Sequence, residues 1–282
     1  MNLRRIEERF FFTCMIVSLL VVLSSLVIIV SLIVFNGASS LSLEMITQTP
    51  TGGYFLGGSG GILNAILGSL FLALPATGLA YLIGMCISLF LQSDFSPSWM
   101  SNSIRLFLDV LWGIPSIVYG IFCLMIMIAL GFSSSLLAGI CALTLLEIPI
   151  ITRYIDESIK TVPIGLKESS YSLGSTKFET SIKVIQRQAL PGILAGVLLG
   201  LGRGIGDAAS ILFTAGFSNN IPTSLFDSTA ALPTMIYSLY AQPNPVVREK
   251  AYAAAFLLLI IVLIISVVSR LLTRRLTKHV LR

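Results

Sequence analysis

Long apolar runs divide this 282-residue chain into segments of membrane-spanning length. A spanning helix needs about 20 mostly apolar residues. Six stretches meet or approach that length: Phe10 to Phe35, Ile62 to Leu91, Leu106 to Gly131, Leu136 to Ile151, Leu190 to Phe217 and Tyr252 to Leu272. The fourth is the shortest and contains Glu147. The pattern predicts an all-α polytopic bundle of six transmembrane helices, with residues 1-282 forming a single membrane domain.

One long polar stretch, from Arg153 to Gln188, interrupts this pattern. Its basic residues are Arg153, Lys160, Lys167, Lys177, Lys183 and Arg187. Pro163 suits the start of a helix that runs to about Leu173, where Gly174 can end it. Thr176 and Glu179 have the spacing of a capping box, which predicts a second helix directly afterwards. We call this predicted pair of short helices the elbow, and expect it to contact a partner protein or to pack under the bundle.

Composition and charge fix the class and the orientation. The chain is 55% hydrophobic and 11% charged, with a mean hydropathy of +0.94, as expected of an integral membrane protein. Of 18 Lys and Arg residues, fifteen lie on one side of the predicted membrane: three before the first span, Arg105, six in the polar stretch and five from Arg270 onward. Because basic loops stay in the cytoplasm, both termini are predicted to be cytoplasmic. The net charge of +5 then reflects topology, not nucleic-acid binding.

Catalytic and metal-binding classes have little support in the sequence. The four cysteines show neither metal-type nor redox-type spacing, so no metal site is predicted. No Gly-x-x-x-x-Gly-Lys-Ser/Thr loop is present to hold nucleotide phosphates. The chain is therefore predicted to bind no cofactor and to catalyse no reaction.

Arg203 is the leading candidate for a functional role, because it lies alone within the fifth predicted span. A charge there costs about 2.5–3.5 kcal/mol on insertion scales, so the side chain is predicted to face the interior. Its guanidinium would suit an oxyanion in transit. The alternative is a structural ion pair with Asp207, one turn later. Arg153 is a second candidate for the pathway, although an Arg at a helix end is often an interfacial anchor.

Two further acids, Glu147 and Asp109, lie within predicted spans and are expected only to pair in the interior. Small residues in the fifth span, including Gly196, Gly200 and Gly204 at four-residue spacing, predict close helix packing.

The polar stretch resembles the coupling loop of ABC importer permeases, whose EAA motif reads Glu-Ala-Ala, three residues, Gly, and a later Leu-Pro. The matching residues are Glu168, Ser169, Ser170, Gly174, Leu190 and Pro191. The resemblance is closest to the PstA family of phosphate permeases. It rests on Gly60 to Ile66, Gly113 to Gly120, Pro149 with Arg153 and Glu157, Gly202 to Asp207, and Leu212 to Gly216.

This chain departs from the family pattern at three places. Ser169 and Ser170 replace the two alanines, and Gln186-Arg187 stands where an earlier Leu-Pro is usual. Gly206-Asp207-Ala208-Ala209-Ser210 replaces Gly-Glu-Thr-Ala-Pro. Under this resemblance, the first two departures are expected to alter the contact with the ATPase, and the third is expected to alter substrate handling.

The resemblance implies a bacterial inner-membrane permease subunit for inorganic phosphate. The implied partners are a PstB-type ATPase dimer that binds ATP-Mg, a PstC-type permease, a PstS-type phosphate-binding protein and membrane lipid. Glu168, Ser169, Ser170, Gly174, Leu190 and Pro191 would couple to the ATPase, while Arg203, Asp207 and Arg153 would line the substrate pathway.

Two alternatives remain open. A permease of the same architecture could carry sulfate, molybdate or phosphonate, because fold does not decide substrate. Gly204-Ile205-Gly206-Asp207 also matches the Gly-x-Gly-Asp string of intramembrane aspartyl proteases, for which Asp109 would have to supply the second carboxylate.

Overall fold

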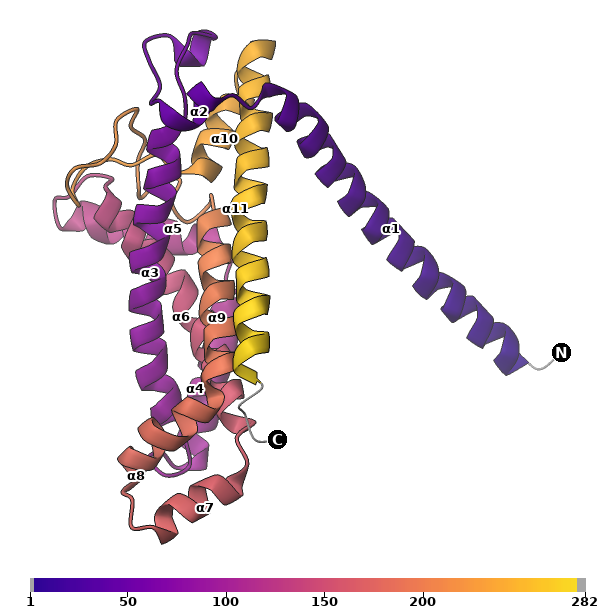
Figure 1. The fold of residues 1–282 in the computed structure, drawn as a ribbon, viewed down its shortest axis with the longest axis vertical. Helices are drawn as coiled ribbons and strands as arrows, with labels where there is room; N and C mark the ends of the chain where they lie inside the picture. The colour runs from indigo at the N-terminus through magenta and orange to yellow at the C-terminus, as the bar shows by residue number, and fades with distance from the viewer. Residues whose placement is uncertain (1–2, 278–282) are drawn as a thin grey trace.

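The computed structural model describes residues 3–277, which form a bundle of helices with one outlying helix (Figure 1). The prediction of an all-α membrane bundle is confirmed. The helices are α1 (Leu3–Ser40), α2 (Leu43–Thr47), α3 (Leu63–Phe90), α4 (Ser98–Gly113), α5 (Ser116–Ala129), α6 (Leu136–Lys160), α7 (Ile164–Ser172), α8 (Lys177–Glu179), α9 (Gln186–Gly206), α10 (Leu232–Tyr240) and α11 (Pro245–Thr277). A 3₁₀ turn at Tyr54–Leu56 follows α2, and a π-helical segment at Thr180–Ile185 joins α8 to α9.

Within residues 3–277, five helices are long and apolar enough to cross a membrane: α1, α3, α6, α9 and α11. The α4–α5 pair supplies a sixth candidate, but it is bent by 96°. The prediction of one continuous helix from Leu106 to Gly131 is therefore wrong. The break falls at Ile114 and Pro115, both with extended ψ angles. A residue before proline is sterically driven out of the helical region, which explains why the helix ends there.

Two other predicted boundaries are also wrong. α6 continues past Ile151 to Lys160, so Arg153 belongs to a helix and not to a loop. The charged residues in this last part of α6 are stabilised in a helical segment packed on α4, because they form ion pairs with one another and with residues of α4. α9 ends at Gly206, well before the predicted Phe217, because Asp207 adopts an extended backbone and its carboxylate accepts from the Ser210 backbone N–H at 2.8 Å.

Glycines let α9 lie almost directly against α6. Gly192, Gly196, Gly200 and Gly204 recur every four residues and so share one face of α9. A Cβ at each would overlap α6, meeting Ser158, Tyr154, Ile151 and Glu147 in turn. The predicted close packing through Gly196, Gly200 and Gly204 is thus confirmed, and α6 is the helix that uses it.

Glu147 ends this row of contacts as a fully buried acid. Its carboxylate lies over Gly204, with Thr77 of α3 as a polar neighbour. Neither carboxylate oxygen has hydrogen-bond geometry to a partner among the described residues. The expected interior pairing of Glu147 is therefore absent from this part of the chain.

α1 slants away from the bundle, which it joins only near its C-terminal end (Figure 1). There Gly37 backs onto Tyr252 and Phe256 of α11. The segment after α1 caps this end of the bundle: the Lys250 ammonium lies 4.0 Å from the ring centroid of the buried Tyr54. The elbow lies at the opposite end, where the described part of α11 also finishes.

Replacing Gly204 by Ala is expected to destabilise the protein, because the added methyl would overlap Glu147 Oε1. Overpacking of this kind costs about 1–3 kcal/mol. Gly202→Ala is the matched control, since its Cβ would meet only Ile265 Cγ2, at an ordinary 3.9 Å. Thermal unfolding of the purified chain in detergent should give a lower Tm for Gly204→Ala and an unchanged or higher Tm for Gly202→Ala.

Adding Glu147→Ala to Gly204→Ala removes the clashing carboxylate and should recover part of the lost Tm. Equal unfolding temperatures for Gly204→Ala and Gly202→Ala would contradict the packing described here.

Candidate functional site

Arg203 lies in the last turn of α9 and its side chain is exposed on the surface of this chain. The prediction that it faces the interior of the bundle is wrong. The neighbouring Gly200 and Gly204 pack directly on α6, but neither α6 nor the rest of the described chain covers the Arg203 side chain. Arg203 takes part in none of the ion pairs found among residues 3–277, and Tyr119 of α5 is close enough to interact with its charge.

Asp207 lies just beyond the helix and caps the turn that follows. Its carboxylate accepts from both the backbone N–H and the hydroxyl of Ser210, which is fully buried against Gly120 of α5. Because the helix has ended, Asp207 is not one helical turn above Arg203, and the alternative of a structural Arg203–Asp207 ion pair is not observed. The carboxylate needed for the protease interpretation, that of Asp109, is instead paired with Arg153.

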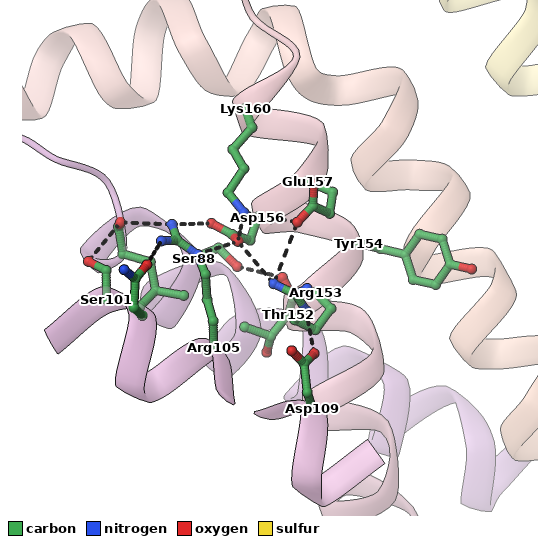
Figure 2. Close-up of polar contacts among 12 residues, drawn as sticks. Ser88, Ser101, Arg105, Asp109, Thr152, Arg153, Tyr154, Asp156, Glu157 and Lys160 are labelled. Carbon is green, nitrogen blue, oxygen red and sulfur yellow. Dashed lines mark hydrogen bonds and ion pairs between the residues drawn. The ribbon is translucent and has the colours of Figure 1, made fainter. Parts of the chain in front are cut away.

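Arg153 belongs to a separate group of charges, the α4–α6 ionic cluster, which Figure 2 shows. The cluster consists of Arg105, Asp109, Arg153, Asp156, Glu157 and Lys160. Arg153 Nε lies 2.8 Å from Asp109 Oδ1. Arg105 binds the fully buried Asp156 through Nε at 2.9 Å and Nη2 at 3.0 Å, and Lys160 Nζ lies 2.8 Å from the same carboxylate.

The cluster joins α4 to α6 and satisfies a carboxylate that would otherwise be buried without a partner, a situation that is strongly destabilising. Sequence reasoning did not identify Asp156 or the role of Arg105. The spacing of Arg153, Asp156, Glu157 and Lys160 on α6, at i,i+3 and i,i+4, was a signal in the sequence that could have identified the α6 part of the cluster.

The structure does not bring Arg153 and Arg203 together. Tyr154 packs on Gly196 whereas Glu147 packs on Gly204, so the two arginines lie at levels of the bundle about two helical turns apart. Arg203 and the Asp207 turn share one region, beside α5, and Arg153 lies nearer the elbow.

The predicted elbow is only partly confirmed. α7 is a separate short helix, but α8 continues through the π-helical segment into α9, so that Lys177–Gly206 forms one helix and the second predicted helix is its first turn. Pro163 precedes α7, and Gly174, at φ +82°, ends it with a left-handed backbone conformation that favours glycine. The predicted capping box is confirmed: Thr176 accepts from the Glu179 backbone N–H, and the Glu179 carboxylate accepts from that of Thr176.

Large apolar side chains of the elbow remain uncovered within this chain. Leu173 is 87% exposed, Ile164 72% and Phe178 64%. Exposed apolar groups gathered on a polar segment indicate a surface for another protein.

The six predicted coupling residues divide into two groups. Glu168, Ser169 and Gly174 are exposed on the elbow, while Ser170 is buried and shares a 2.8 Å hydrogen bond with Thr180. Leu190 is half-buried and Pro191 is buried within α9, so these two belong to the bundle.

Comparison with known proteins agrees with this geometry. Residues 84–281 match the family described as binding-protein-dependent transport system inner membrane component. The phosphate transport system permease protein PstA of Mycobacterium leprae is 34% identical over 92% of this chain and 86% of its own length. PstA of Yersinia pestis is 31% identical over 95% of this chain and 90% of its own length.

Solved structures share the fold at lower identity. A chain of the inward-facing MetNI methionine ABC transporter superposes with a TM-score of 0.62 at 20% identity, covering 76% of this chain and 95% of that one. A chain of a bacterial alginate ABC transporter gives a TM-score of 0.67 at 13% identity and covers 99% of both chains.

The predicted permease fold and the predicted role as a non-enzymatic transport subunit are thus confirmed. With its apolar helices and its exposed elbow, this chain belongs to the family of binding-protein-dependent transport system inner membrane components, the integral inner-membrane subunits of ABC importers, and groups within it with the PstA permeases.

Proposed function

We propose that this chain is one of two permease subunits of an ATP-driven importer of inorganic phosphate. The observation that carries the proposal is the similarity to phosphate permeases over more than nine-tenths of the chain. The partners that complete such an importer are a PstC-type permease, a PstB-type ATPase dimer holding ATP-Mg and a PstS-type binding protein. This chain itself is proposed to hold no cofactor.

The exposure of Arg203 supports a pathway between two permeases. A route shared by two subunits lies on the surface of each one, so a residue that lines it is exposed in the single chain. There Arg203 meets the second permease and not lipid, which removes the cost of placing a guanidinium in hydrocarbon. Its fork of donors matches two oxygens of a phosphate.

Asp207 and Arg153 take different parts in this proposal. Asp207 shapes the turn beside Arg203 through Ser210 and so sets where the pathway widens. Arg153 is held by three carboxylates, those of Asp109, Asp156 and Glu157, and reaches substrate only if these release it.

The elbow is proposed to contact the ATPases, with Glu168, Ser169, Ser170 and Gly174 at the contact and Leu190 and Pro191 carrying movement into α9. This arrangement places the elbow and both termini in the cytoplasm. Closure of the ATPases around ATP would push on the elbow, and α6 and α9, to which it is joined at either end, would tilt and switch access to the pathway.

Import of another oxyanion, such as sulfate, molybdate or phosphonate, is the less favoured alternative, because the relatives that match over most of this chain are named as phosphate permeases. Competition by each oxyanion against labelled phosphate in proteoliposomes containing the whole complex distinguishes the candidates.

Arg203→Gln is expected to reduce phosphate uptake by the reconstituted complex roughly tenfold or more, because a hydrogen bond to a charged group contributes about 1.5–3 kcal/mol. Uptake of labelled phosphate and hydrolysis of ATP should be measured in the same vesicles. Hydrolysis should persist, since the ATPase contact is untouched. Arg274→Gln, at an arginine of α11 that is also exposed, is the control and should behave like the parent. Parental uptake by Arg203→Gln would refute the pathway role.

Leu173→Asp is expected to release the ATPase from the complex. The Leu173 side chain, at the end of α7, is 87% exposed in the single chain. In the proposed complex the ATPase buries this position, where a carboxylate without a partner would cost several kcal/mol. Co-purification of the ATPase with a tagged permease should fall at least about tenfold. The matched control is Leu56→Asp, an 81% exposed leucine at the opposite end of the bundle. Full retention of the ATPase by Leu173→Asp would show that the elbow does not bind it.

A further inference from the structure

Asp94 lies in the turn between α3 and α4, and two lysines from the elbow meet it. Lys167 of α7 forms an ion pair with the Asp94 carboxylate through Nζ and Oδ2. Lys177, on the other side of Gly174, donates from Nζ to the Asp94 backbone carbonyl at 3.2 Å. One residue of the bundle therefore holds both arms of the elbow.

Tyr171, one turn after Lys167 on α7, faces the same group. Its hydroxyl is buried, and burial, followed by the neighbouring Asp94 carboxylate, raises the pKa of Tyr171 to about 12. The tyrosine thus stays neutral beside the ion pair and shields it on one side. We call Asp94, Lys167, Tyr171 and Lys177 the Asp94 latch.

The ion pair of the latch differs from an ordinary surface pair. The Lys167 side chain is 19% exposed and that of Asp94 is 15% exposed. In the Lys183–Glu179 pair of the same segment the corresponding values are 68% and 45%. Pairs as exposed as the latter contribute little, whereas removing one partner of a largely buried pair leaves an uncompensated charge.

The turn that carries Asp94 is itself fixed to the bundle. The Leu91 carbonyl, at the end of α3, accepts from Ser101 Oγ at 3.1 Å and from Arg105 Nη2 at 3.1 Å, both on α4. Arg105 then binds Asp156 of α6 through two hydrogen bonds. Polar contacts, together with the short stretch of chain from Leu91 to Asp94, therefore connect the elbow to α3, α4 and α6.

We propose that Asp94 is a positioning residue that transmits movement of the elbow to α3 and α4, so that these helices move together with α6 and α9. The inference rests on the proposed function of the elbow as the site of ATPase contact. The covalent links from α6 to α7 and from α8 to α9 act directly on α6 and α9, and α3 and α4 follow through packing and the α4–α6 ionic cluster. The Asp94 latch adds a direct link from the elbow to the turn between α3 and α4.

The first test is Asp94→Asn in the whole complex, in proteoliposomes, with phosphate uptake and ATP hydrolysis measured together. The ratio of phosphate taken up to ATP hydrolysed should fall roughly fivefold or more, while the ATPase stays bound and active, because an unpaired Lys167 no longer holds the elbow. Lys183→Gln, which removes the exposed Lys183–Glu179 pair and leaves the capping box intact, should leave the ratio unchanged. An unchanged ratio in Asp94→Asn would overturn the proposal.

Charge reversal separates transmission from simple folding. Asp94→Lys and Lys167→Asp should each lower the ratio, and the double variant should restore at least about half of it, because the pair re-forms in the opposite sense while the Asp94 backbone carbonyl remains for Lys177. If the single variants fail to assemble and the double variant fails equally, the proposal is overturned.

Hydrogen exchange of the purified full-length chain gives a result that does not depend on substrate. Asp94→Asn should speed amide exchange in α7 and in residues 92–97 by roughly tenfold, with α11 unaffected. If the parent complex hydrolyses ATP without taking up phosphate, the proposed function fails. The exchange measurement still shows whether Asp94 holds the elbow to the turn between α3 and α4. Unchanged exchange would refute it.

Discussion

The close contact between α6 and α9 is the constraint on which the rest of the structure depends. Four glycines of α9 remove every side chain that would separate the two helices, and α6 fills the space with Ser158, Tyr154, Ile151 and Glu147. In a membrane, where apolar side chains gain little from meeting each other in place of lipid, such close backbone approach is what drives helices together. The contact has one direct consequence: the connection between the two helices must protrude as the elbow.

Charged residues have different surroundings at two levels of the α6–α9 pair, that of Asp156 and that of Arg203. Near the elbow, Asp156 is buried but satisfied by Arg105 and Lys160, so a fully desolvated carboxylate becomes a link between helices. At the level of Arg203, the described residues supply no carboxylate partner, and the guanidinium is left on the surface. An arginine that is already paired is restrained by its neighbours, whereas an unpaired one is available to an anion. This difference is the physical ground for preferring Arg203 to Arg153 as a contact for substrate.

Features set by local sequence were predictable. The bounds of α3 follow from the apolar run of Ile62 to Leu91, and the capping box at Thr176 and Glu179 needs only a three-residue spacing. Features set by tertiary contact were not. The continuation of α6 to Lys160 depends on α4 supplying Arg105, and the exposure of Arg203 depends on how far the neighbouring helices cover the end of α9. The break at Pro115 had a local signal, but the apolar run around it outweighed that signal in the prediction.

The contrast between α1 and α6 bears on how the chain enters its membrane. None of the residues in the most apolar described stretch of α1 is buried by the rest of the chain, whereas 72% of those in α6 are. α1 can therefore move from the insertion machinery into lipid without another helix, since lipid solvates it fully. α6, with its acids, is poorly solvated by lipid until it has packed against α4, which is made before it, and against α9, which is made after it. Biogenesis of this subunit thus requires that α6 be kept from contact with lipid until α9 has been synthesised.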